Sequence, residues 1–450
     1  MKIPRIANEF DYWDMLISDS IAQNLAVEDQ SVKSLGAHNA KALWVRGVYK
    51  GSWVMVSSQN TKNLQDAFRE ALKLGRVRGA NVHIKKQRVK DSVTVTPEKN
   101  PFGEDLEKQL KRVLLLSKTT KGVDKRVRRV FATLASVKSK NEFYDSEGSM
   151  LFETDYKTMY SVSALAREGD VMQRAHKGDA RTGGLEVFYD KGIVGLAQDT
   201  VAMALRLLHA KHAPAKTLPL VCDGALSGVF FHEAVGHACE ADAILEGASV
   251  MKGMMGKAVA SPLVSFSDGL VQHSFGSYQY DSEGVKKTTT PLIKDGVLTG
   301  YLHSLDTASK MKAEPTGNGR SQSVYHFPIP RMSTSILRPG TFTKDELIRD
   351  IKEGVYAAGS SGGQVIPTEG KFVFGAQEAW LIKDGEITTP LRDVSLTGNI
   401  LKTLQLIDGI GKKSVLSEGG FCGKAGQSVP VGEFAPHMRI SKVVVGGRAE

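Results

Sequence analysis

The residues whose types and spacing best suit chemistry lie in one apolar run, Phe230–His237, near the middle of the chain. The run contains His232, then Glu233 directly after it, and His237 five residues after the first histidine. Imidazole nitrogens are preferred ligands of Zn²⁺, and a nearby carboxylate can take the proton of a polarised water molecule. In the common zinc motif H-E-x-x-H, however, the histidines stand four residues apart on one helical face.

The five-residue spacing sets a geometric condition on this run. Five residues of a regular α-helix turn through about 500°, so the two imidazoles would point about 140° apart. A local π-bulge widens the turn, is often found at functional sites, and would let His232 and His237 converge. Gly236 makes such a distortion easier. The alternative is an ordinary helix in which Glu233 and His237 pair at i,i+4. Spacing alone leaves both interpretations open.

Six blocks of the C-terminal half resemble, in unchanged order, the TldD branch of the TldD/PmbA family. The blocks are His232–Asp242, Thr316–Arg320, Pro328–Met332, Gly362–Val365, Gly370–Phe374 and Cys422–Gly432. The N-terminal half matches the family only in its general pattern. This resemblance implies a zinc metalloprotease that degrades unfolded or unstructured peptides, with one Zn²⁺ per subunit.

The resemblance also implies roles for individual residues. It makes His232, His237 and Cys422 the metal ligands, and Glu233 the general base that activates a metal-bound water. Family members pair as dimers, so we expect either a homodimer or a heterodimer with a metal-less PmbA/TldE-like paralogue. A non-catalytic partner subunit is the alternative function, but this chain keeps every residue of the metal motif.

The residues themselves also favour Cys422 among the three cysteines as a third ligand. Cys422 lies among several glycines, where a backbone can fold tightly over a site. Cys222 ends the apolar run Leu218–Cys222 and is expected in a buried strand. Cys239 comes two positions after His237, about 200° round a helix, and is expected to face away from the site.

Further polar residues are candidates for supporting roles. Glu240 shares a helical stripe with His237 and is expected to orient it or to bind the metal, and Asp242 is a weaker candidate. Arg320 and Arg331 either hold substrate carbonyls or a carboxylate, or form structural ion pairs. Both alternatives stay open from the sequence.

A second H-x-x-H pair, His209 and His212, has a simpler explanation. It lies at the end of a long helix expected over Asp190–His209, just before Pro214. Cationic side chains in the last turn of a helix complement its dipole. We interpret this pair as structural.

Length and composition indicate a globular protein of two or three domains. The chain has 450 residues, of which 41% are hydrophobic and 24% charged. It has no run of 18 apolar residues, and Met1–Asp19 lacks the apolar core of a signal peptide. Three cysteines do not form a disulfide framework and fit a reducing compartment. We therefore expect a cytoplasmic protein that does not contact membranes.

The net charge of +10 is concentrated in one region. Residues 51–140 contain 21 Lys and Arg against 8 Asp and Glu. Such a region suits nucleic acid or acidic peptides, but it is equally typical of a solvated surface. Because no aromatic residues interleave with the basic ones and no nucleic-acid motif is present, we do not expect nucleic-acid binding.

Local patterns predict an α+β fold. It consists of an N-terminal α/β unit, a middle segment rich in antiparallel strands, and a β-rich C-terminal metal-binding domain. The predicted domains are 1–97, 98–213 and 214–450, divided at the turn-rich segment Pro97–Pro101 and in the linker Ala210–Leu218.

Apolar spacing and turn residues predict the individual elements. Helices are expected at Glu9–Asn24, from a cap at Asn60 or Thr61 to Gly75, from Asn100-Pro101 onward with Leu106 and Leu110 on its apolar face, at Asp190–His209 and at Thr343–Tyr356. Antiparallel strands are expected in residues 127–180. Lys383–Glu386, with Asp-Gly at its centre, predicts a hairpin turn.

Overall fold

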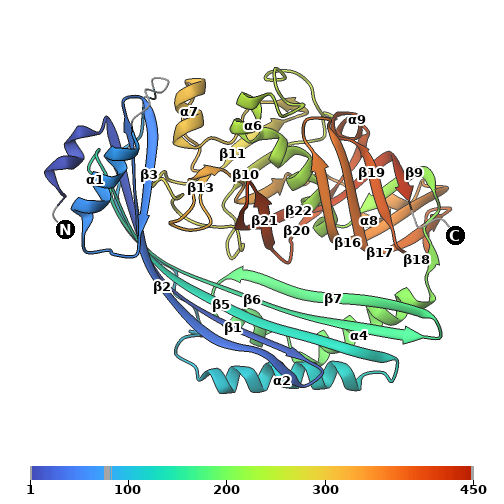
Figure 1. Cartoon of the computed structure of the whole chain (residues 1–450). Coiled ribbons are helices and arrows are strands. Elements are labelled where there is room, and N and C mark those ends of the chain that lie inside the picture. Colours follow the sequence, from blue (N-terminus) through green and yellow to red (C-terminus); the bar gives the residue numbers. More distant parts are fainter. Residues whose placement is uncertain (1–2, 76–81, 83, 447–450) are drawn as a thin grey trace.

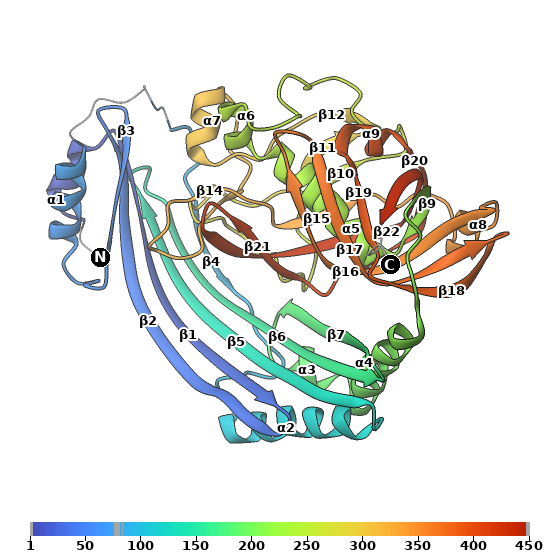
Figure 2. The ribbon, with the colours of Figure 1, turned by 45° about the vertical axis from the view of Figure 1, so that its right-hand side comes forward.

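The computed structural model of the chain describes residues 3–75, 82 and 84–446. Within these residues the fold is α+β, as predicted, and consists of two large sheets and one two-stranded sheet. Figures 1 and 2 show the first large sheet as long curved strands beneath the C-terminal domain, which contains the second.

The first sheet has seven strands among the described residues, in the order β3-β2-β1-β5-β6-β4, with β7 also paired to β6. Their bounds are β1 (Tyr12–Glu28), β2 (Ser31–Tyr49), β3 (Ser52–Ser58), β4 (Lys90–Thr94), β5 (Val127–Asp145), β6 (Met150–Glu168) and β7 (Val171–Thr182). Strands from both of the first two predicted domains therefore share one sheet, and the predicted boundary between them stays a prediction. The antiparallel strands expected in residues 127–180 are confirmed.

Helices cover the outer face of this sheet and the end of the sheet that lies near the N-terminus of the chain. Their bounds are η1 (Arg5–Glu9), α1 (Leu64–Leu74), α2 (Leu106–Gly122), α3 (Glu186–Tyr189) and α4 (Ile193–His209). Val113 and Leu116 of α2 and Ala197 and Val201 of α4 pack in one core with the strands. The opposite, concave face is left to the C-terminal domain (Figure 2).

The second sheet has thirteen strands within the described ranges, mostly in the order β12-β11-β10-β15-β22-β9-β16-β17-β18-β8, with β19, β20 and β21 attached to it. Its strands are β8 (Lys211–His212), β9 (Lys216–Cys222), β10 (Phe266–Gly269), β11 (Thr290–Lys294), β12 (Val297–Leu298), β15 (Thr334–Leu337), β16 (Glu353–Ile366), β17 (Lys371–Lys383), β18 (Glu386–Arg392), β19 (Ser395–Asn399), β20 (Ile407–Leu416), β21 (Gly420–Lys424) and β22 (Gln427–Gly446). The small sheet pairs β13 (Gly319–Arg320) with β14 (Ile329–Pro330).

The helices of the C-terminal domain are short, and α5 is the one that leads into the histidine motif. They are α5 (Gly224–Phe231), α6 (Ala241–Glu246), α7 (Leu305–Met311), α8 (Lys344–Ile348) and α9 (Ile400–Gln405). The hairpin predicted at Lys383–Glu386 is confirmed between β17 and β18, where Asp384 and Gly385 both have positive φ angles.

Two helix predictions are wrong. Residues predicted as a helix at Glu9–Asn24 mostly form β1, which pairs with β2 and β5 along its length. Both faces of β1 are buried near its start, so the period-2 alternation of a half-buried strand is hidden there. Of the helix predicted at Thr343–Tyr356, only α8 (Lys344–Ile348) is helical, because Glu353 already begins β16, which pairs with β9 and β17.

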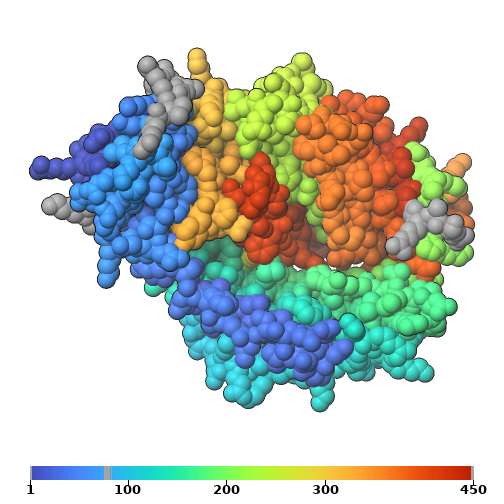
Figure 3. Space-filling view, in the orientation of Figure 1, coloured from blue at the N-terminus to red at the C-terminus, as the bar shows by residue number. Residues whose placement is uncertain are grey.

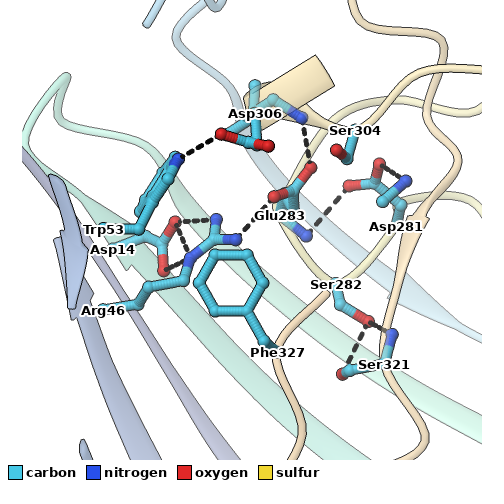
Figure 4. Close-up of polar contacts among 12 residues, drawn as sticks. Asp14, Arg46, Trp53, Asp281, Ser282, Glu283, Ser304, Asp306, Ser321 and Phe327 are labelled. Carbon is cyan, nitrogen blue, oxygen red and sulfur yellow. Dashed lines mark hydrogen bonds and ion pairs between the residues drawn. The ribbon is translucent and has the colours of Figure 1, made fainter. Parts of the chain in front are cut away.

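A buried ion cluster joins the first sheet to the C-terminal domain (Figure 4). Arg46 of β2 donates hydrogen bonds to Asp14 of β1 and, at 2.6 Å, to Glu283 of the C-terminal domain. None of these three side chains is exposed to solvent. The guanidinium also lies over the rings of Trp53 and Phe327, 4.3 and 5.1 Å from their centroids. Arg46 therefore holds the two parts of the molecule in one arrangement.

We predict that Arg46→Met lowers the free energy of unfolding by about 3–5 kcal/mol, because Asp14 and Glu283 would stay buried without their cation. Urea-induced unfolding measures this change. Lys41→Met on the same strand is the matched control, since its ion pair with Asp19 is roughly half exposed (side chains 55% and 45%) and should contribute less than about 1 kcal/mol. Equal losses in both variants would contradict this role of Arg46.

Candidate metal centre

The first half of the site begins with the short helix α5, which packs on β22 of the second sheet. Asp223, at the end of β9, caps α5 by accepting a hydrogen bond from the Leu226 backbone amide at 2.8 Å. At Gly228, one turn before His232, a Cβ would lie 2.5 Å from the Cβ of Glu433 on β22. The helix therefore packs on β22 more closely than a larger residue at position 228 would allow.

The histidines lie in a π-helical turn, the one of the two interpretations of their spacing that lets them converge. Residues His232–Gly236 form η2, in which the His237 amide donates to the His232 carbonyl, five residues back. η3 (His237–Cys239) and α6 follow. The extra residue brings the two imidazoles to 5.4 Å between centroids. The π-bulge prediction is confirmed, and the regular-helix alternative is wrong.

Cys422 reaches the histidines from the far end of the chain. It lies in β21, which forms a hairpin with the start of β22 and places Cys422 opposite Val429. Its Sγ lies 3.2 Å from His237 Nε2. One possible ligand atom from each of His232, His237 and Cys422 lies within 4.8 Å of the other two. The structure thus brings together the three residues that the sequence predicts as ligands.

The three side chains polarise one another. Burial favours the neutral thiol, but the two histidines lower the pKa of Cys422 to about 4. Burial likewise opposes the charged form of His232, yet the Cys422 thiolate raises the pKa of His232 to about 9. The pKa of His237 is raised against the effect of burial by Glu240 and Cys422. A thiolate is the form of cysteine that binds metals.

Glu233 lies at the open side of this cluster. Its carboxylate Oε2 is 3.9 Å from His237 Nε2, and its side chain keeps 23% of its surface exposed. Burial raises the pKa of Glu233 above the usual range. Glu233 is thus close to the ligand atoms and still accessible to water, as a proton acceptor beside a metal must be.

Glu240 pairs with the far nitrogen of His237. Its Oε2 lies 2.9 Å from His237 Nδ1 and 3.0 Å from Lys424 Nζ. Burial alone would raise the pKa of Glu240, but His237 and Lys424 lower it to about 2. The ionised carboxylate orients the ring and leaves Nε2 facing Cys422. Of the two roles predicted for Glu240, its position fits the orienting one.

The remaining candidates lie around the cluster in different settings. Asp242 pairs with Lys424 at 2.8 Å. Arg331 has no exposed surface and donates to the Cys422 carbonyl. Arg320 is 7% exposed, donates to the Met332 carbonyl and lines a cavity.

The other histidines and cysteines lie outside the cluster. His209 pairs with Glu168 at 3.4 Å and His212 with Asp393 at 3.5 Å, as side chains in structural contacts do. Cys222 and Cys239 are buried in the hydrophobic core of the C-terminal domain. Within the described ranges, His232, His237 and Cys422 are the group of His, Cys, Asp and Glu side chains close enough to hold a metal ion.

Three residues at the site have no signal in the sequence that singles them out. Ser335 Oγ lies 3.3 Å and Glu433 Oε1 3.9 Å from His232 Nδ1. The third is Lys424, the partner of Glu240. Lys424 and Glu433 lie inside and directly after the block Cys422–Gly432, but only the strand pairing shows what they contact.

A large cavity lies between the two parts of the molecule, and the residues that line it do not include His232, Glu233, His237 or Cys422. Its volume is about 1120 Å³. Lys157 of β6, Arg181 of β7, Arg320 and Phe421 are among the residues that line it. Phe421 directly precedes Cys422 and is 54% exposed. Figure 3 shows the hollow between the long sheet and the C-terminal domain.

The basic region 51–140 contains both paired and unpaired cations in its described part. Several of its cations form ion pairs with neighbours on the same helix, as Arg69 does with Asp66 and Lys111 with Glu107. Residues 76–81 and 83 lie outside the described residues. None of the described helices has the length and apolarity needed to span a membrane.

The donor set fits a divalent metal ion. Two imidazoles and one thiolate are typical zinc ligands, and three protein ligands leave a fourth position for water or substrate, as in catalytic zinc sites. The closeness of the ligand atoms and the lowered pKa of Cys422 suit the same ion.

Comparisons with known proteins identify the family. Models for the PmbA/TldA metallopeptidase domains match most of the chain. They cover residues 13–75 (domain 1), 99–208 (central domain) and 215–447 (C-terminal domain).

Individual relatives cover nearly the whole chain or its larger part. A protein of Methanothermobacter thermautotrophicus named metalloprotease is 38% identical over 443 residues, 98% of this chain and 97% of the relative. A zinc metalloprotease TldD homolog of Saccharolobus solfataricus is 32% identical over 310 residues, 68% of each chain. TldE from Thermococcus kodakarensis, a crystal structure, shares the fold, with a TM-score of 0.78, 18% identity and 98% coverage of each chain.

We predict that His232→Ala, His237→Ala and Cys422→Ser each abolish or greatly weaken metal binding, because each removes one of three ligands. Elemental analysis of the purified chain measures the metal content. Cys239→Ser is the matched control, since this thiol is buried outside the cluster, and it should keep the metal. Stoichiometric metal in all three ligand variants would contradict the site.

Proposed function

This chain belongs to the PmbA/TldA (TldD/PmbA) metallopeptidase family, and we propose that it is a zinc-dependent peptidase that hydrolyses unstructured peptides. The observation that carries this proposal is the convergence of His232, His237 and Cys422, with Glu233 beside them. The relative named zinc metalloprotease supports the choice of zinc. We propose one Zn²⁺ per subunit.

Each residue of the cluster has a distinct task in this proposal. A bound zinc ion lowers the pKa of a water molecule to about 7 and polarises a peptide carbonyl. Glu233 accepts the proton of the attacking water and then delivers it to the leaving amine. Glu240 holds His237 in the orientation that points Nε2 into the site. Because a thiolate donates more charge than a third imidazole, Cys422 makes the ion a weaker Lewis acid, which is consistent with slow turnover.

The cavity between the two parts of the molecule, which Phe421 next to Cys422 helps to line, supports an extended substrate. A volume of about 1120 Å³ exceeds an ordinary small-molecule pocket, which measures about 300–1,000 Å³, but is far too small for a folded domain. We expect the substrate backbone to bind the strand-rich walls by β-augmentation, a mode of binding that needs little side-chain specificity. Arg320, on the wall, is a candidate for holding substrate carbonyls or a carboxylate.

The assembly and the location are further parts of this proposal. We propose a homodimer or a heterodimer with a metal-less TldE-like paralogue, and the shared fold with TldE supports a partner of this type. We also propose a cytoplasmic location, which three free cysteines support because they fit a reducing compartment. The alternative of a non-catalytic partner subunit is disfavoured by the complete set of ligands and general base.

We predict that Glu233→Gln keeps the fold and the metal but lowers peptide cleavage by a factor on the order of 10² to 10⁴, as loss of a general base does. Single-turnover cleavage of an unstructured peptide, together with metal content, measures both effects. Near-full turnover by the variant would move the proton-handling role to another residue.

We predict that the protein cleaves unfolded chains with broad side-chain tolerance and leaves compact domains intact, because only extended chain enters the cavity. One disulfide-bonded protein, offered first folded and then reduced and unfolded at equal concentration, makes the comparison. Equal cleavage rates for the two forms would contradict the restriction to extended chain, although the zinc chemistry would still stand.

A further inference from the structure

One buried segment contacts each of the three predicted ligands or the residues that hold it in place. It is Arg331–Ser335, which we call the template segment, and each of its residues has at most 1% of its surface exposed. It leads from β14 into β15, which pairs with β10 on one side and β22 on the other. Its neighbours therefore come from four separate stretches of the chain.

At one end of the template segment, Arg331 supports two ligands. Its Nη2 donates to the Cys422 carbonyl and its Nη1 donates to the Gln427 carbonyl at 3.3 Å, so it holds both strands of the β21–β22 hairpin. Its Nε faces Glu240 Oε1 at 3.9 Å as an ion pair, and Glu240 in turn holds His237. Arg331 thus links the cysteine strand to the histidine turn.

In the middle of the template segment, Met332 supports the π turn. A Cβ added at Gly236 would lie 1.9 Å from Met332 Sδ. The backbone of η2 thus rests directly on this side chain, and only glycine at position 236 permits the approach. Met332 also presents its carbonyl to Arg320, which fixes it from the cavity side.

At the other end of the template segment, Ser335 supports the first ligand. Its Oγ lies 3.3 Å from His232 Nδ1. Ser335 is the register partner of Glu433 in the parallel pairing of β15 with β22, and Glu433 approaches the same nitrogen at 3.9 Å. With Nδ1 engaged, Nε2 is the nitrogen of His232 left for a metal.

We propose that the template segment sets the relative positions of His232, His237 and Cys422, with Arg331 and Ser335 as positioning residues. This inference rests on the proposed zinc site. It assigns Arg331 to the support of the ligands rather than to substrate, because the side chain has no exposed surface, donates to the Cys422 and Gln427 carbonyls, and forms an ion pair with Glu240. Residues that hydrogen-bond to metal ligands in this way hold the ligands in orientation and tune the affinity for the metal.

The test uses the full chain with Arg331→Gln, Arg331→Lys and Ser335→Ala. Zinc affinity is measured by competition with a chelator, and ligand geometry by the absorption of the Co²⁺-substituted protein, whose thiolate-to-metal and d–d bands report Cys422 ligation. Arg331→Gln and Ser335→Ala should each lower zinc affinity by about 10–100-fold and shift the cobalt spectrum. Arg331→Lys should lose less zinc affinity than Arg331→Gln, because it keeps a cation beside Glu240. It should still bind zinc less tightly than the parent chain, because lysine lacks the planar fork with which Arg331 donates to both carbonyls.

Two matched controls should keep the parent affinity and spectrum. Arg338→Gln changes an arginine whose pair with Asp295 is exposed, and Ser267→Ala changes a serine on the neighbouring strand β10. If the parent chain and the controls bind no zinc, the proposed function fails. If they bind zinc and the template variants bind it with the same affinity and spectrum, the positioning role is overturned. Should Arg331→Gln not fold, Ser335→Ala and Arg331→Lys decide the question.

Discussion

Backbone pairing along β22 is the interaction on which the metal centre depends. This strand pairs with β9, which leads into the histidine helix, with β15, which contains Ser335, and with β21, which contains Cys422. Cys422 and His237 are 185 residues apart, yet their side chains lie 3.2 Å apart. Because each pairing fixes a register, one strand determines where three distant stretches of the chain meet.

Buried charges mark the places where separate parts of the molecule must meet in one arrangement. Arg46 joins the first sheet to Glu283 of the C-terminal domain, and Glu240 joins the histidine turn to Lys424 of the cysteine strand. Burying ions is costly unless each finds its partner, so a wrong arrangement would leave charges unpaired. We infer that these clusters specify geometry more than they add to net stability.

Local sequence patterns predicted the helices, strands and turns well where one hydrophobic period dominates. They predicted them poorly where both faces of a strand are buried. The Asp-Gly turn of the Lys383–Glu386 hairpin forms as predicted because its backbone requirement is local. Near the start of β1, Trp13, Met15 and Ile17 pack in one core, while Asp14 is buried with Arg46. With both faces buried there, the apolar spacing resembled that of a helix, and the strand was missed.

The sequence by itself determined the chemistry of the site: its donor types and the glutamate beside the first histidine. Counting residues showed only that two histidines five apart converge if the helix is wider there, and the fold decided that it is. Cys422 was predicted as a ligand, but tertiary structure alone decided how it reaches the histidines, that Ser335 and Glu433 flank His232, and that Arg331 is buried behind the ligands. The reason is physical: spacing along the chain determines only local directions, whereas contacts between distant segments depend on strand pairing and burial.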